Sequence, residues 1–120
     1  MFLMNLEQLR KYCHSKKAVT EEWPFGPDTL VFKVMGKMFI LMGYIPEPES
    51  INLKCDPADS LALRAEFEGI VGGYHMNKRH WITVSLDSDV PEPLIWELID
   101  DSYDLVVAKL PRRLKDQISS

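Results

Sequence analysis

Residues 29–43, TLVFKVMGKMFILMG, are the stretch that decides the fold of this 120-residue chain. The apolar pattern has a period of two, which is typical of a strand with one buried face. Leu30, Phe32 and Val34 would share that face, and Lys33 would lie on the other. A glycine near the middle supplies a short turn. The stretch therefore predicts a β-hairpin.

The segments on either side of the hairpin predict the remaining elements. In chain order, these are a helix at 5–16, strands at 29–35, 37–43 and 50–55, a helix that begins at Asp56-Pro57, a strand at 81–86 and a helix from about 89 to 110. Asn5 and Asp56 are residue types that cap helices, and the sequence from Asp89 to Glu92 resembles a capping box. The order α-β-β-β-α-β-α predicts an α+β fold, in which helices cover one face of an antiparallel sheet.

Helical periodicity predicts which side of each helix is buried. The apolar face of the middle helix would be Ala58, Leu61, Ala62 and Ala65, and the stripe of the last helix would be Ile95, Leu98, Ile99, Val106 and Leu110. The acids Glu97, Asp100, Asp101 and Asp104 would then face solvent. Residues 69–73 are glycine-rich and predict a loop, and Arg112, Arg113 and Lys115 predict a basic tail after Pro111.

Length and composition restrict the class of protein. A chain of 120 residues fits a single domain, and 46% apolar residues is an ordinary globular content. The net charge of −4 argues against a generic nucleic-acid-binding protein, which is usually basic. Cys13 and Cys55 lack metal-ligand spacing and predict buried free thiols in a reducing cytoplasm. No membrane span or signal peptide is predicted.

One segment has a charge opposite to that of the whole chain. Residues 74–81, YHMNKRHW, contain two cations, two histidines and two large aromatics, and no acid lies between Gly69 and Leu86. Such a patch is suited to phosphate or another anion. Strand alternation places Lys33, Asn52, Lys54, Trp81 and Thr83 together on the sheet face opposite the helices.

Several motifs in this order resemble the MmcQ/YjbR family of small bacterial proteins. They are residues 22–26 (EWPFG), 31–34 (VFKV), 36–39 (GKMF), 52–57 (NLKCDP), 73–81 (GYHMNKRHW) and 102–103 (SY). The resemblance covers roughly residues 5–110. It implies a frataxin-like, double-wing α+β fold and a DNA-binding role, and it carries no catalytic residues to transfer.

These observations lead to the hypothesis that the chain binds DNA or another polyanion. A regulatory role is one interpretation of that binding. Lys78 and Arg79 would contact phosphate, and Trp81 would stack on a base or sugar. The patch would be completed by Lys33, Lys37, Lys54, His75 and His80. A second interpretation is that the same residues only hold the loop in place. In that case the chain would be a protein-interaction or small-ligand module.

The sequence predicts neither an enzyme nor a cofactor. No nucleophile–base pair is recognisable, and Asp56 beside Cys55 would raise the pKa of the thiol. His75 and His80 lack a third ligand, so no zinc site is predicted. Iron binding by the acids of the last helix is a third possibility, although their spacing matches an ordinary solvent-facing side.

Overall fold

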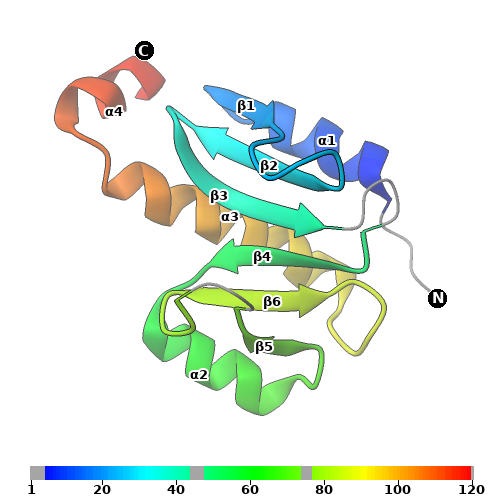
Figure 1. The fold of residues 1–120 in the computed structure, drawn as a ribbon. Helices are drawn as coiled ribbons and strands as arrows, with labels where there is room; N and C mark the ends of the chain where they lie inside the picture. The colour runs from blue at the N-terminus through cyan, green and yellow to red at the C-terminus, as the bar shows by residue number, and fades with distance from the viewer. Residues whose placement is uncertain (1–4, 44–47, 74–76, 120) are drawn as a thin grey trace.

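The structure, a computed structural model, describes residues 5–43, 48–73 and 77–119 (Figure 1). Its elements are α1 (Leu6–His14), β1 (Val19–Glu22), β2 (Thr29–Val34), β3 (Lys37–Gly43), β4 (Ser50–Lys54), α2 (Pro57–Glu66), β5 (Ile70–Gly72), β6 (Trp81–Ser85), α3 (Glu92–Ala108) and α4 (Arg112–Ser119). The six strands form one antiparallel sheet in the order β1-β2-β3-β4-β6-β5. The predicted α+β class is confirmed.

Helices cover one face of this sheet. In Figure 1, α1 and α3 lie behind the strands, and α2 lies beside β5. The predicted α3 stripe is buried against the sheet, where Ile99 has no exposed surface and Leu98 is 5% exposed. Both cysteines are buried and free, as predicted. Within the described ranges, none of the helices has the length and hydropathy that a bilayer crossing requires.

The predicted hairpin is formed by β2 and β3. Met35 and Gly36 connect the strands with φ angles of 49° and 81°, the positive values that a tight hairpin turn requires. Leu30, Phe32 and Val34 are fully buried, as expected. The pairing shifts between Phe32 and Lys33, so the hairpin contains a bulge.

Three elements were not predicted. β1 contains only one apolar residue, Val19, so its sequence carries no alternation signal. The segment at 69–73 is not entirely a loop, because Ile70–Gly72 pairs with β6 as a three-residue edge strand. The basic tail is helical: the amides of Leu114 and Lys115 donate to the carbonyl oxygen of Pro111. Pro111 therefore lies immediately before α4, after α3 has ended at Ala108.

The predicted buried face of α2 is wrong. Leu61 is 64% exposed, and Ala58, Ala62 and Ala65 are exposed as well. The helix instead buries Ser60 and packs Leu63 and Phe67 against the core. Alanine and leucine at helical spacing identified an apolar side of α2, but tertiary packing turns that side outward.

The predicted helix caps had two different outcomes. Asn5 caps α1 in a complete capping box with Gln8, and Asp56 accepts hydrogen bonds from the first turn of α2. The Asp89 prediction is wrong, because the N-cap of α3 is Pro91 and has no side-chain bond. Asp89 instead accepts from the amides of Glu68 (2.9 Å) and Gly69 (2.8 Å). These bonds lower the pKa of Asp89 and tie the β6–α3 loop to the start of β5.

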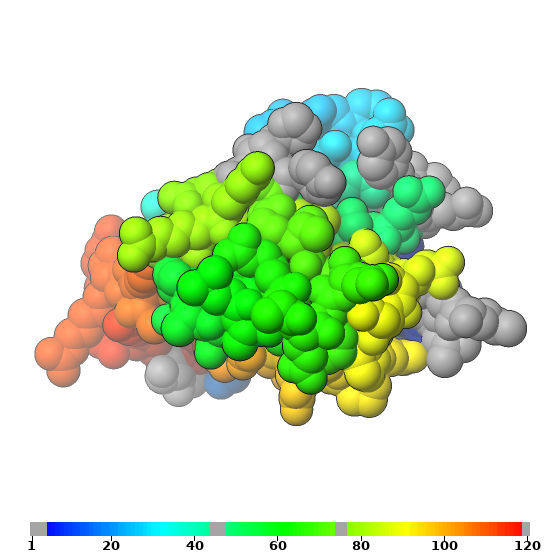
Figure 2. Space-filling view, turned by 90° about the horizontal axis from the view of Figure 1, so that it is seen from below, coloured from blue at the N-terminus to red at the C-terminus, as the bar shows by residue number. Residues whose placement is uncertain are grey.

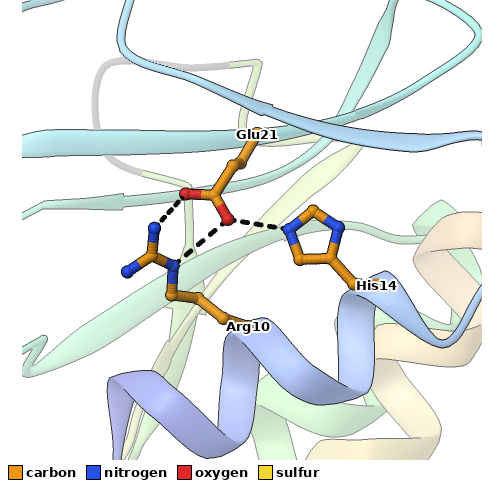
Figure 3. Close-up of polar contacts among 3 residues, drawn as sticks. All are labelled: Arg10, His14 and Glu21. Carbon is orange, nitrogen blue, oxygen red and sulfur yellow. Dashed lines mark hydrogen bonds and ion pairs between the residues drawn. The ribbon is translucent and has the colours of Figure 1, made fainter.

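A carboxylate joins the first helix to the first strand (Figure 3). Glu21 on β1 accepts from Arg10 Nε at 3.1 Å and also bonds the second guanidinium nitrogen. His14 Nε2 lies 2.7 Å from the same carboxylate. The Arg10 bond is the main reason why the pKa of Glu21 lies below its ordinary value of 4.5.

Replacing Glu21 with glutamine should lower the free energy of unfolding by about 1 kcal/mol at pH 7, since the contact is partly exposed. The pKa is depressed in the folded state, so the carboxylate stabilises the protein above about pH 4.5 and loses this effect as the pH falls through the folded-state value. Urea unfolding of both proteins at pH 7 and pH 3 measures this. A difference that stays constant with pH would contradict the assignment.

Candidate functional site

The antiparallel sheet brings the predicted cations to one end. Each strand runs opposite to its neighbour, so the ends of β2 and β4 lie beside the beginnings of β3 and β6. Lys54 ends β4, Lys37 begins β3, and Trp81 begins β6 directly after Lys78 and Arg79. In Figure 1 these strand ends all lie toward the left of the view.

Lys54 connects this end of the sheet to α3. It is the cross-strand partner of Trp81, and its amide donates to the hydroxyl of Ser102 at 2.8 Å. Partial burial, followed by the positive charge of Lys109, lowers the pKa of Lys54. Lys109 at the end of α3 therefore adds charge to the same region.

Hydrogen bonds fix the loop before β6. The side-chain oxygen of Asn77 accepts from the amide of Arg79 at 2.9 Å, and its backbone oxygen accepts from the amides of His80 and Trp81. The His80 carbonyl in turn accepts from the amide of Cys55 at 2.8 Å. This turn leaves the Lys78 and Arg79 side chains exposed on an ordered backbone.

Arg64 on α2 reaches the same loop. A Cβ atom on Gly72 would lie 3.2 Å from Lys78 Cβ and 3.3 Å from an Arg64 guanidinium nitrogen. Lys78 and Arg64 therefore both lie beside Gly72. A side chain in place of Gly72 would occupy the space next to them. Sequence reasoning missed Arg64 because it placed α2 in the wrong rotation, and it missed Lys109 because only tertiary packing brings α3 to Lys54.

We call this cluster the basic end. It comprises Lys37, Lys54, Arg64, Lys78, Arg79 and Lys109. Among the described residues, no carboxylate forms an ion pair with any of them. Lys33 differs, because its ammonium lies 3.1 Å from Glu22 on β1. Lys33 was predicted to extend the patch, but this ion pair compensates its charge.

Two residues of the predicted polar sheet face are buried. Asn52 and Thr83 are only 9% and 5% exposed, and the Thr83 hydroxyl donates to the Asn52 side-chain oxygen at 2.6 Å. Asn52 also donates to the Leu41 carbonyl oxygen. The two residues pair across neighbouring central strands and satisfy each other. They lie on the predicted face but are not available to a ligand.

His80 and Trp81, two further predicted site residues, are less accessible than Lys37, Lys78 and Arg79. His80 and Trp81 are half-buried, and a Cβ on Gly73 would lie 2.9 Å from Trp81 Cβ. The Gly73 backbone therefore lies close to the Trp81 backbone and Cβ, and Trp81 presents only part of its surface. His75 lies outside the described residues.

The acids of α3 are not all directed into solvent. Asp100 accepts from the Tyr12 hydroxyl at 2.6 Å and pairs with Lys16 at 2.6 Å, so it joins α3 to α1. The exposed-face prediction is therefore wrong for this residue. In the described part of the chain, no group of three or more metal-ligating side chains is placed to hold a metal ion.

Neither cysteine has the properties of a nucleophile. Burial raises the pKa of Cys13 to about 12 and that of Cys55 to about 11. The carboxylates of Asp59 and Asp56 raise the Cys55 value further, in the direction expected from the sequence. Both thiols are therefore protonated at neutral pH.

Comparison with known proteins gives a consistent set of relatives. The YjbR family model matches residues 14–105. Escherichia coli O157:H7 YbdF is 46% identical over 76% of this chain and 75% of its own length, and E. coli K12 YjbR is 30% identical over 90% and 92%. Both are described as uncharacterized proteins. The crystal structure of Deinococcus radiodurans DR2400, with a DUF419 domain, superposes with a TM-score of 0.89 at 35% identity, covering 99% of this chain and 91% of that one.

Proposed function

The chain belongs to the YjbR family, and on that premise we propose that it is a non-enzymatic protein that binds DNA or another polyanion through its basic end. The observation that carries the proposal is the collection of cations at one end of a chain with a net charge of −4, where none of these cations forms an ion pair within the described ranges. Such a local cluster attracts phosphate even when the whole molecule is acidic.

The loop geometry supports contact with phosphate oxygens. Lys78 and Arg79 project from a turn that Asn77 holds in place, so few backbone degrees of freedom are lost when an anion binds. Arg64 and Lys37 approach from neighbouring elements. A sugar-phosphate backbone passing this end would therefore meet cations from the sheet and from α2.

The proposed binding depends on the charge of the DNA backbone and not on the base sequence. Lys78 and Arg79 lie in a loop rather than on a helix, and the neighbouring Trp81 is half-buried. Phosphate contacts position a protein on DNA but do not select bases. We therefore expect weak binding with little sequence preference.

The protein should bind labelled double-stranded DNA at about 20 mM salt and lose most of this affinity at about 200 mM, because phosphate contacts release counterions. Fluorescence anisotropy with two unrelated DNA sequences measures both effects. Comparable affinities for the two sequences are expected. An absence of binding at low salt would rule out the proposed function.

The competing function is a protein-interaction or small-ligand module. Exposed aromatics in the β1–β2 loop favour protein interaction: Trp23 is 40% exposed and Phe25 is 65% exposed. Large aromatics are enriched in binding hot spots. A partner recovered by affinity capture after nuclease treatment, and lost with Phe25→Ser, would support this alternative.

A further inference from the structure

A groove of about 580 Å³ lies between α2 and α3, next to the buried Cys55. Its floor is apolar and includes Ala62 and Leu63 from α2, and Leu94, Leu98 and Leu105 from α3. Figure 2 looks toward this side of the molecule, where α2 (green) crosses the front of the view. Ala62 belongs to the apolar side of α2 that packing leaves uncovered.

The walls of this groove are acidic. Asp56 and Asp59 line it from α2, and Asp101 and Asp104 line it from α3. Among the described residues, no lysine, arginine or histidine forms an ion pair with these four carboxylates. Of the lining residues that the structure describes, Lys54 alone is a cation.

The negative charges around Asp101 act on it mainly from its own helix, α3, and also from Asp59 on α2. Partial burial, followed by the charges of Asp104, Asp100, Glu97 and Asp59, raises the pKa of Asp101. Among the described residues, the charges that shift the pKa of Asp101 are all carboxylates. A cation in the groove would therefore relieve repulsion among the acids of α3 and between Asp101 and Asp59.

We propose that the α2–α3 groove binds a small organic cation that joins an ammonium group to an apolar body. The volume falls within the range of about 300–1,000 Å³ that is typical of small-molecule sites, and such sites combine an apolar lining with a few polar groups. The apolar body would cover the leucines, and the ammonium would lie between Asp59 and Asp101. This site adjoins the basic end through Lys54, which lines the groove, and it is complementary to ligands of the opposite charge.

Octylammonium and octanoate provide a matched test because they share an alkyl chain and differ in the sign of their charge. Titration of the ¹⁵N-labelled full chain should give saturable amide shifts at Ala62, Leu63 and Leu98 with octylammonium. Octanoate should bind at least about tenfold more weakly, since two carboxylates favour the cation. Equal affinities, or shifts located outside the groove, would overturn the proposal.

Variants test the carboxylates of the groove and its apolar lining separately. Asp59→Asn and Asp101→Asn should each weaken octylammonium binding, by up to about fivefold. Asp87→Asn removes an exposed carboxylate outside the groove lining and should leave affinity unchanged. Ala62→Phe should block the groove from an exposed helix position without opening a core cavity. If all three asparagine variants behave alike, the groove carboxylates do not recognise the cation.

Discussion

Ser102→Ala should lower the free energy of unfolding by about 2–4 kcal/mol, although it removes a single oxygen atom. The Ser102 side chain is fully buried. Its hydroxyl accepts from the Lys54 amide at 2.8 Å and donates to the Phe39 carbonyl oxygen at 2.6 Å. Alanine would leave a buried donor and a buried acceptor without partners, each at a cost of about 1–3 kcal/mol.

The position of Ser102 explains why the effect should be large. In the antiparallel pairing of β3 with β4, Ile40 lies opposite Leu53 and Leu41 lies opposite Asn52. Phe39 and Lys54 are the next residues on these strands, and there the Ser102 hydroxyl bridges the two backbones. Through Ser102, helix α3 thus links strand β3 to strand β4 next to the basic end.

Urea unfolding measures this prediction, with Ser88→Ala as the control because Ser88 is exposed. The control should change the free energy of unfolding by less than about 0.5 kcal/mol. An equally small loss for Ser102→Ala at an unchanged m-value would show that the bridge does not contribute to stability.

The double variant Lys78→Ala with Arg79→Ala should weaken DNA binding by about 10- to 100-fold at low salt, because each side chain is proposed to contact phosphate. Both side chains are exposed, so the stability of the fold should not change. Anisotropy titrations measure the affinity, and circular dichroism verifies the fold. A change of less than about twofold would remove this loop from the binding surface.

Lys11→Glu is the matched control for this variant. The double variant removes two positive charges, and Lys11→Glu removes one and adds a negative charge, so both lower the net charge by two. Lys11 is exposed on α1 and is not part of the basic end. Its substitution should have a much smaller effect, which separates local contact from overall charge.

Local sequence signals predicted the elements that depend on local chemistry. The β2–β3 hairpin, the Asn5 and Asp56 caps and the buried stripe of α3 follow from alternation, capping residues and helical spacing. The short β5 strand has no such signal, since its three residues acquire strand geometry by pairing with β6. The rotation of α2 also depends on its neighbours, because Ser60 and Arg64 are less apolar than the exposed Leu61.

The candidate site could be predicted only in part. Lys78 and Arg79 stand out in an acid-free segment, and antiparallel pairing brings Lys37 and Lys54 to the same end of the sheet. The ion pair that compensates Lys33 requires β1, which the sequence did not reveal. Contacts between distant segments also determine that Arg64 and Lys109 join the cluster.

The salt dependence of DNA binding is the decisive measurement of phosphate contact by the basic end. The logarithm of the association constant should fall linearly with the logarithm of salt concentration, with a slope of about −0.9 for each phosphate contact. The Lys78→Ala/Arg79→Ala variant should have a slope that is shallower by about 1.8, and Lys11→Glu should keep the wild-type slope. Identical slopes for the wild-type protein and the double variant would contradict phosphate binding by the basic end.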